Sequence, residues 1–278
     1  MPLEALRRSD PAPAEVIVVD NGSRDGLSRF VRRQYPEVLL VRSRRNLGFA
    51  GGNNLGLVNA SGEVLLLLND DTEPDPDWLR PLQDAFRADR RLGVAGCRLL
   101  YPGRETVQHL GGIVHQNGLT DHARWGERNS PATEGDGLLE AHYVTGAAMA
   151  IRREVLAMIG LLDPGYWPIY FEEVDFCERA RRAGWKVAVV PASTVVHHES
   201  RTTERLSPRF LRLYHRNRIR FLLRNRPPRQ WPGILRAELR WLLGNTPWDN
   251  LWPCALAYAA APLHLLDAYL LRKGAPQR

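Results

Sequence analysis

The sequence predicts an α/β fold in which helices flank a mostly parallel sheet, followed by a basic helical appendage. Two continuous apolar runs, Glu15–Val19 and Glu63–Leu68, have the length and composition of strands buried on both faces of a sheet. A helix to about Gln34 and a strand at Val38–Val41 are expected between them. Such alternation indicates right-handed βαβ units, whose ligands bind beyond the carboxyl ends of the strands.

Further elements are expected outside these runs. After the second run, Asp75 is expected as an N-cap and Pro76 as the first helical residue. The glycine-rich segment 46–60 predicts a turn and a short helix. Residues 99–144 are polar and rich in Gly and His, which we interpret as an extension of the sheet with loops.

The composition is that of an ordinary globular protein. Of 278 residues, 44% are apolar and 25% charged, enough for one large α/β domain and an appendage. Cys97, Cys177 and Cys254 lie far apart and form neither a disulfide ladder nor a CxxC site, so a reduced, cytosolic compartment is expected. The segment 1–10 lacks the apolar stretch of a secretory signal.

The positive charge is concentrated toward the C-terminus. The chain carries a net charge of +7, and residues 201–240 hold twelve arginines and no lysine against Glu204 and Glu238. This pattern is typical of a solvated helix surface or of a surface that meets an anionic membrane. Binding to nucleic acid ranks last, because Trp231 and Trp241 suit a membrane interface better.

The most apolar window is Leu251–Leu266. Its 16 residues fall short of the roughly 20 that span a bilayer, and Pro253 and Pro262 interrupt it. An interfacial or re-entrant helix pair is therefore expected rather than a membrane span.

Carboxylates follow both buried runs. Asp70 and Asp71 repel each other at the end of the second run, and Mg²⁺ or Mn²⁺ bridging a diphosphate would compensate. Alternatively, one acid points to solvent and the other caps the next helix. Asp20, at the end of the first run, could bind a base or ribose, or serve an Asx-turn.

The glycine-rich turn Asn46–Asn54 does not have the G-x-G-x-x-G spacing of a dinucleotide site. A dinucleotide cofactor is therefore not expected. The glycines allow the close approach either of donor phosphate or of an adjacent strand.

Residues 171–184 predict a helix with acids in its first turn, arginines in its last and Gly184 at its C-terminal cap. The helix dipole alone favours this arrangement. Alternatively, Glu173 or Asp175 faces the crevice as a general base. Glu172 and Asp175 share a face that Glu173 does not, so all three cannot serve one site.

His197 and His198 follow a strand expected at Lys186–Val190. An imidazole combined with carboxylates suits a transition-metal site. Paired histidines in a loop are also common on protein surfaces, so the pair alone leaves both interpretations open.

These motifs occur in a characteristic order. They are Glu15–Ser23, Asn46–Asn54, Leu68–Thr72, Thr145–Met149, Gly160–Asp163, Tyr170–Asp175, Arg182–Gly184 and His197. Over residues 14–200 the chain resembles the family 2 inverting glycosyltransferases of the GT-A (nucleotide-diphospho-sugar transferase) fold, particularly their rhamnosyltransferase-like branch. Each motif is loose alone, but the ordered set is specific.

The resemblance implies a role for each matching residue. It places the catalytic base at Glu173, where the family commonly has Asp, with Asp175 as the second catalytic residue. It assigns a divalent metal, Mg²⁺ or Mn²⁺, to Asp71 and His197, with His198 as a fallback. The implied donor-binding residues are Asp20, Asn21, Ser23, Asn46, Gly48, Asn53 and Asp70; the implied acceptor-binding residues are Trp167, Tyr170 and Gly146.

The implied reaction moves a sugar, for which the branch suggests rhamnose, from a nucleotide-diphosphate donor to a lipid-linked or glycan acceptor of the bacterial cell envelope. Residues 1–200 would form the GT-A domain and residues 201–278 a basic, helical, membrane-associating region. The protein would be cytoplasmic and peripherally bound to the inner face of the membrane, without a nucleic-acid partner.

The chain departs from the family at its start, because Met1–Leu6 resembles the tail of the helix that follows the family's first strand. A central strand buries about five side chains at roughly 1.5–3 kcal/mol each, which is on the order of a whole domain's stability. We therefore expect a misassigned start or a fragment. The alternative is a truncated, non-catalytic remnant that binds a membrane or a partner.

Overall fold

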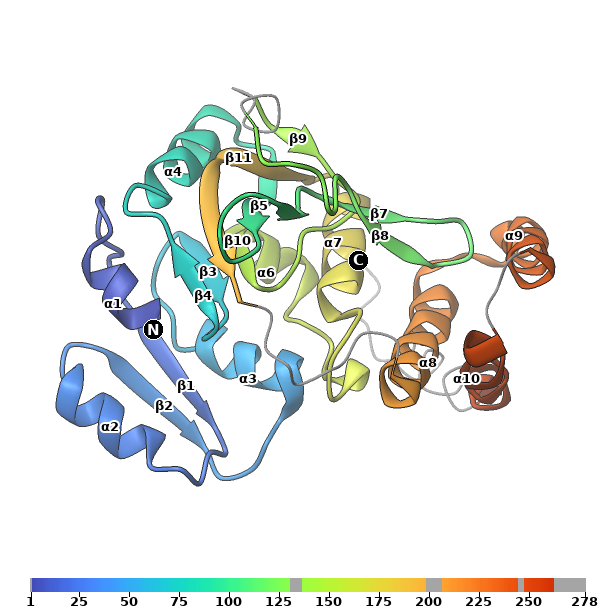
Figure 1. The fold of residues 1–278 in the computed structure, drawn as a ribbon, viewed down its shortest axis with the longest axis horizontal. Helices are drawn as coiled ribbons and strands as arrows, with labels where there is room; N and C mark the ends of the chain where they lie inside the picture. The colour runs from blue at the N-terminus through green and yellow to red at the C-terminus, as the bar shows by residue number, and fades with distance from the viewer. Residues whose placement is uncertain (1, 131–136, 199–206, 245–247, 263–278) are drawn as a thin grey trace. The chain divides into compact units, whose positions relative to one another are not determined.

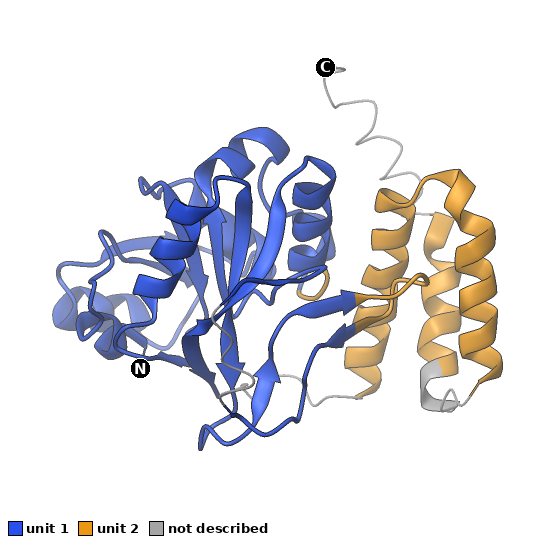
Figure 2. Cartoon of the chain, turned by 90° about the horizontal axis from the view of Figure 1, so that it is seen from above, with its two compact units in different colours: residues 1–113, 121–168, 172–200 blue, residues 114–120, 169–171, 201–278 orange. Residues whose placement is uncertain are grey.

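The computed structural model describes residues 2–130, 137–198, 207–244 and 248–262 (Figure 1). The chain divides into two compact units, coloured separately in Figure 2. Unit 1 comprises Met1–Ile113, Asp121–Pro168 and Glu172–Ser200, and unit 2 comprises Val114–Thr120, Ile169–Phe171 and Arg201–Arg278. Unit 2 thus contains two short segments from before residue 200, and the division into domains 1–200 and 201–278 stays a prediction.

Unit 1 is built on a seven-stranded sheet. Its main path runs β3 (Val64–Leu68), β10 (Ala148–Arg152), β5 (Leu92–Leu100), β11 (Lys186–His197) and β4 (Thr72–Pro74); β6 (Val107–His109) pairs with β5, and β9 (Leu139–Glu140) with β11. Strands β5 and β11 are parallel, whereas β10 is antiparallel to both of its neighbours.

The sheet is therefore mixed, and the expectation of a mostly parallel sheet is wrong for this part of the chain. The described residues between β5 and β10 form short strands and loops, and no described helix connects the two strands. Antiparallel strands can be joined by such connections, whereas parallel strands need a crossover that is usually a helix.

The predicted βαβ unit near the N-terminus is confirmed. β1 (Ile17–Asn21) and β2 (Leu39–Ser43) pair in parallel and are connected by α2 (Leu27–Gln34), as Figure 1 shows. Among the described residues these two strands pair only with each other. Only Asp20 of β1 is fully buried, so the expectation that the first run is buried on both faces is wrong.

The other helices that the structure describes in unit 1 pack mainly on its strands. They are α1 (Pro2–Arg7), α3 (Gly48–Leu57), α4 (Leu79–Ala88), α6 (Arg153–Ile159), η1 (Pro164–Tyr166) and α7 (Glu172–Arg182). The central core consists of Trp78, Leu82 and Phe86 of the α4 region packed on alanines and leucines of the sheet strands. A small two-stranded sheet, β7 (Gly112–Val114) and β8 (Thr120–His122), completes the strands.

The helix α4 begins at Leu79, so the predicted cap at Asp75 is wrong. The carboxylate of Asp75 instead pairs with Arg104, with Nη1 and Oδ1 2.6 Å apart. The backbone N–H of Asp75 donates to the carbonyl of Thr194 (3.1 Å). Asp75 is thereby held against the sheet, and a turn separates it from the helix.

The helix predicted at 171–184 is confirmed as α7, with Glu172, Glu173 and Asp175 in its first turn. Gly184 has φ +91°, the left-handed conformation that suits a C-terminal cap. The acids therefore lie at the positive end of the helix dipole.

Unit 2 contains α8 (Pro208–Asn225), η2 (Pro228–Gln230), α9 (Trp231–Leu243) and α10 (Trp248–Ala259). The helix α10 continues through Pro253, so the expected interruption there is wrong, and residues 263–266 of the predicted apolar window lie outside the described residues. None of the helices that the structure describes combines the length and apolar character needed to cross a bilayer.

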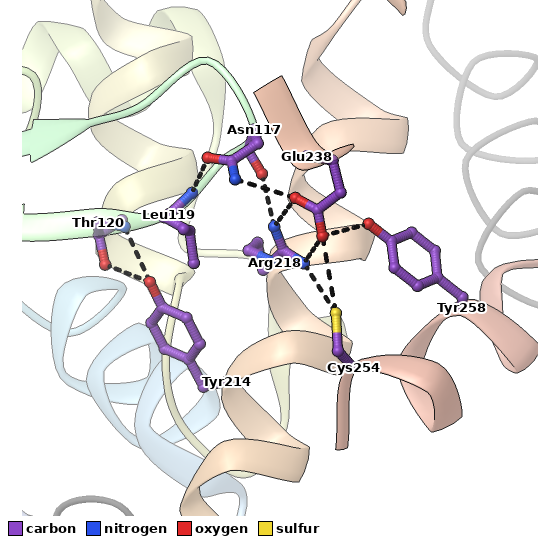
Figure 3. Close-up of polar contacts among 8 residues, drawn as sticks. All are labelled: Asn117, Leu119, Thr120, Tyr214, Arg218, Glu238, Cys254 and Tyr258. Carbon is purple, nitrogen blue, oxygen red and sulfur yellow. Dashed lines mark hydrogen bonds and ion pairs between the residues drawn. The ribbon is translucent and has the colours of Figure 1, made fainter. Parts of the chain in front are cut away.

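A buried polar network joins the helices of unit 2 (Figure 3). Arg218 of α8 donates from Nη1 and Nη2 to the two carboxylate oxygens of Glu238 on α9, each at 2.7 Å. Glu238 also accepts hydrogen bonds from Asn117 (2.9 Å) and from Tyr258 of α10 (2.5 Å). Burial raises the pKa of Glu238, but Arg218 and the other donors outweigh it and hold that pKa below its ordinary value.

Candidate active site

A continuous set of contacts brings the ends of several elements together in unit 1. Beyond the end of β3, Asn69 donates its N–H to the carbonyl of Ala147, at the start of β10 (3.0 Å). The neighbouring Gly146 has no room for a Cβ atom, which would lie 2.6 Å from the ring of Phe49. Phe49 in turn donates its N–H to the carbonyl of Pro168 (2.8 Å).

The same contacts continue to β1. The amide of Asn21 accepts from the N–H of Leu47 (2.9 Å) and donates to the carbonyl of Gly48 (3.0 Å). Asn46 accepts from the N–H of Gly48 (2.8 Å) at the start of α3. The carboxyl ends of β1 and β3, the start of α3 and the start of β10 therefore form one contiguous region, as the strand-end rule predicts.

Within this region, Asp71 and His197 face each other across a strand pair. Thr72 of β4 lies opposite His197 of β11 in the antiparallel register. This pairing places His197 Nε2 3.1 Å from Asp71 Oδ1, and both side chains are largely buried. The other ring nitrogen, Nδ1, lies 2.7 Å from Oε1 of the buried Gln108 on β6.

The pair fits a divalent metal. Two ligands bound at about 2.1 Å and at right angles to each other lie about 3 Å apart, which matches the Asp71–His197 separation. In the tautomer that Gln108 favours, His197 donates from Nδ1, and the Nε2 lone pair is directed at the Asp71 side. A second hydrogen bond of this kind is typical of metal-binding histidines.

The protein supplies only part of such a coordination shell. Among the described residues, no three His, Cys, Asp or Glu side chains gather in a group that could hold a metal. The remaining ligands would be substrate or water oxygens, as is usual for Mg²⁺.

The neighbouring acid and histidine are placed differently. The backbone N–H of His198 donates to the carbonyl of Asp71 (2.9 Å), but its exposed ring lies 3.6 Å from Glu73. Asp70 is exposed. The geometry therefore favours His197 over His198 as the partner of Asp71.

Asp20 is only 1% exposed at the end of β1. It accepts from the N–H of Ser23 (2.8 Å) and the hydroxyl of Ser28, and it pairs with Arg42 (3.2 Å). Burial raises the pKa of Asp20, but the hydrogen bonds from Ser28 and Ser23 outweigh it, so the net shift is downward. Asp20 is thus a carboxylate at neutral pH.

A hollow of about 570 Å³ adjoins Asp20. Its lining includes Ser23 and Ser28 together with five arginines, Arg24, Arg29, Arg32, Arg33 and Arg42. Asp20 therefore lies beside a strongly basic surface.

The glycines of the Asn46–Asn54 turn lie within α3, as does the following Gly56, and they pack against protein. A Cβ atom at Gly52 would lie 2.8 Å from Asn21, and one at Gly56 would lie 3.2 Å from Val19. Asn53 bonds its own helix at the carbonyl of Phe49 (3.0 Å). Close approach to the adjacent strand β1 thus accounts for Gly52 and Gly56.

Only one of the three acids that begin α7 is accessible. Glu172 and Asp175 are buried, whereas Glu173 is partly exposed. Burial raises the pKa of Glu173 to about 7, against backbone N–H groups at the helix start that lower it. A carboxylate with this pKa is suited to general base catalysis near neutral pH.

Asp175 has a different environment. It accepts from the hydroxyl of Tyr166 (3.1 Å) and from Nε of Arg179 (2.7 Å), and it has no exposed surface. Arg179 also donates to the carbonyls of Ile159 and Leu161. We expected Asp175 among the catalytic residues, but its contacts tie α7 to the loop that precedes it.

The two aromatic residues expected at the acceptor side fall in different units. Trp167 of unit 1 is 55% exposed and lies against Gly48, where a Cβ atom would be 2.7 Å from its ring. Tyr170 belongs to unit 2, where its ring lies 5.0 Å from that of Phe210 and its carbonyl accepts from Asn217 (2.9 Å). Tyr170 and Phe171 have φ of 84° and 75°, a strained conformation typical of functional loops.

Sequence patterns did not reveal Gln108, Ser28, Arg42 or Arg179. Gln108 lies in a three-residue strand within the segment 99–144 that we interpreted only as loops and sheet extension. Ser28 and Arg42 belong to a helix and a strand flanking Asp20, and only the fold brings them to it. No local sequence pattern marks these residues as part of the site.

Solved structures identify the fold as GT-A. The crystal structure of GalNAc-T7 with UDP, GalNAc and Mn²⁺ matches with a TM-score of 0.62 at 17% identity, over 95% of this chain and 52% of that chain. The predicted α/β, GT-A fold is thereby confirmed, with a mixed central sheet.

The sequence profile of glycosyl transferase family 2 matches residues 3–160, more than half of the chain. The chain therefore belongs to glycosyl transferase family 2. The N-acetylglucosaminyl-diphospho-decaprenol L-rhamnosyltransferase of Mycobacterium tuberculosis is 28% identical over 267 residues, which cover 87% of this chain and 83% of that protein. The uncharacterized protein y4gI of Sinorhizobium fredii is 32% identical over 195 residues, and the match covers 67% of this chain but only 21% of that protein.

Proposed function

We propose that this chain transfers a sugar from a nucleotide-diphosphate donor to an acceptor hydroxyl, with inversion at the anomeric carbon. The observation that carries the proposal is the Asp71–His197 pair held by Gln108. It supplies two ligand atoms at a separation that suits a divalent metal, at the strand ends where such sheets bind ligands.

Asp71 and His197 would hold Mg²⁺ or Mn²⁺. When bound, the metal neutralises the negative charge of the departing nucleoside diphosphate. Asp20, a buried carboxylate beside a basic hollow, would bind the nucleotide base or ribose, with Ser23 in the same turn. Asn21, Asn46 and Gly48 would contribute by holding the loop that leads into α3.

Glu173 would act as the base. Its carboxylate accepts the proton of the acceptor hydroxyl while that oxygen forms a bond to the anomeric carbon. The bond between that carbon and the diphosphate oxygen breaks, and its electron pair leaves with the diphosphate. Asp175 would position α7 through Tyr166 and Arg179, and Trp167 would contact the acceptor.

The acceptor is proposed to be a lipid-linked or glycan molecule at a membrane, and the sugar rhamnose. The name of the mycobacterial relative, a rhamnosyltransferase acting on a decaprenol-linked acceptor, supports both suggestions. Neither the sugar nor the acceptor follows from the residues of the site themselves.

The test is a panel of radiolabelled nucleotide sugars offered to the chain with Mn²⁺ and a bacterial membrane fraction as acceptor. The expected result is label transferred from one donor and dependence on the metal. Chelation with EDTA serves as the control. Turnover of none of the donors would contradict the proposal and favour a non-catalytic remnant that binds a membrane or partner.

A further inference from the structure

Unit 2 presents apolar side chains to solvent in a regular pattern. On α9, Leu235, Leu239 and Leu243 are 59%, 56% and 78% exposed. Their spacing of four residues places them along one face of the helix. Contiguous exposed apolar residues of this kind mark interaction surfaces, whereas single ones are ordinary.

The interior of unit 2 fixes the orientation of this face. Ile234 and Glu238 of α9 are buried, and Glu238 is held by Arg218, Asn117 and Tyr258 (Figure 3). Because the network anchors that side of α9, the leucine face cannot rotate inward without breaking the ion pair. The exposure of the leucines is therefore a property of the folded unit.

The helix α10 also presents apolar side chains to solvent. Residues 251–262 contain no charged side chain. Pro253, Cys254 and Ala257 are buried, whereas Trp252 is 70% exposed and Leu256 38% exposed. A tryptophan at the surface of an apolar helix is typical of a membrane interface.

The charge of unit 2 is strongly positive. Residues 207–262 contain ten arginines and no lysine, against Glu238 and Asp249. Glu238 is neutralised internally by Arg218. On α9, Arg236 and Arg240 are exposed and follow Leu235 and Leu239 directly, so a row of arginines runs beside the row of leucines.

We propose that the exposed faces of α9 and α10 form a docking surface for the headgroup region of an anionic lipid bilayer. The leucines and Trp252 enter the boundary between headgroups and acyl chains, and Arg236 and Arg240 contact lipid phosphates. The proposal extends the membrane-associated acceptor of the proposed function. The test of membrane docking uses neither donor nor metal. The docking proposal and the proposed transferase activity can therefore fail separately.

The adjacent arginine row distinguishes a lipid surface from a second copy of the chain. A two-fold symmetric dimer through the leucine row would bring identical arginine rows near each other, and like charges repel. A nucleic acid would satisfy the arginines but would leave the leucines in water. An anionic bilayer offers phosphates to the arginines and an apolar interior to the leucines at the same time.

The experiment measures co-sedimentation of the full chain with vesicles of phosphatidylcholine, alone or mixed with phosphatidylglycerol. We expect binding to the mixed vesicles that weakens with added salt. Leu235→Glu/Leu239→Glu should weaken it at least about tenfold. Quenching of tryptophan fluorescence by brominated acyl chains should fall in Trp252→Phe.

The matched control is Val58→Glu/Met158→Glu, which changes two residues of unit 1 with similar exposure, 62% and 61%. It should bind vesicles like the wild type. Arg236→Gln/Arg240→Gln should abolish the preference for phosphatidylglycerol, and it serves as a second variant if the glutamate pair fails to fold.

Three results would overturn the proposal. The first is a wild-type chain that does not bind the mixed vesicles. The second is binding that Leu235→Glu/Leu239→Glu leaves unchanged, or that the control pair reduces equally. The third is a wild-type dimer, seen by analytical ultracentrifugation, that these leucine substitutions dissociate.

Discussion

His197 and Asp71 are 126 positions apart in the sequence, yet the pairing of β11 with β4 holds Nε2 and Oδ1 3.1 Å from each other. Gln108 fixes the other face of the ring at Nδ1. The pair is therefore positioned by backbone pairing and by a third side chain, which is the arrangement that a metal-binding imidazole needs.

The first prediction concerns the metal ligands. Asp71→Ala should abolish metal-dependent turnover, because it removes one of two protein ligands. The matched control is His198→Ala: this neighbouring residue contacts Asp71 through its backbone and has an exposed ring. Turnover is measured against Mn²⁺ concentration. Unchanged activity in Asp71→Ala would remove the assignment.

The second prediction concerns Gln108. Gln108→Ala should raise the Mn²⁺ concentration needed for half-maximal activity by about 10- to 100-fold, the usual cost of losing a residue that orients a metal ligand. Saturating Mn²⁺ should restore most of the rate. A loss of rate that no Mn²⁺ concentration restores would show that Gln108 has another role.

Sequence and structure agree most closely where one strand or helix carries the information. Local periodicity and capping residues correctly predict the loop and helix from Asp20 to Gln34 and the helix α7. They also predict where both apolar runs end. The antiparallel orientation of β10 and the contact of His197 with Asp71 depend on the pairing of strands that lie far apart in the sequence. No local pattern encodes such pairing. Gln108 illustrates the limit, because a single Gln in a three-residue strand has no signature.

The third prediction concerns Glu173. Its pKa of about 7 means that the carboxylate form, which accepts a proton, predominates above that pH. The rate should fall by about tenfold per pH unit below it. Glu173→Gln should lower kcat by roughly 10²- to 10⁴-fold. The exposed acid Glu63, changed to Gln, is the control.

The pH profile also tests whether Glu173 or the metal site accounts for the acid limb. Glu173→Asp should move the acid limb of the kcat profile, whereas saturating Mn²⁺ should not. If the acid limb of the kcat profile shifted only with the Mn²⁺ concentration, the metal site and not Glu173 would account for it.

The fourth prediction separates positioning from catalysis at Asp175. Asp175→Asn breaks a buried ion pair with Arg179, which is expected to cost about 3–5 kcal/mol of stability. The melting temperature should fall, and kcat should fall less than in Glu173→Gln at a temperature where the variant is folded. A folded, stable Asp175→Asn with the kcat of Glu173→Gln would support the expected catalytic role of Asp175 instead.

The last prediction concerns the network of unit 2. Arg218→Met leaves Glu238 buried without its cation, which should cost about 3–5 kcal/mol near neutral pH. In the wild type, the pKa of Glu238 is lowered from 4.5. The ion pair therefore contributes its full stability above about pH 4.5 and loses it as the pH falls through the lowered value.

The variant should behave in the opposite way, because burial without Arg218 raises the pKa of Glu238 and protonation then relieves the penalty. The difference in melting temperature between wild type and Arg218→Met should be largest near neutral pH and narrow in acid. Circular dichroism melts at several pH values measure it, with the exposed Arg229→Met as control. A difference independent of pH would show that Arg218 stabilises unit 2 through packing on Trp241 and its neighbours, not through Glu238.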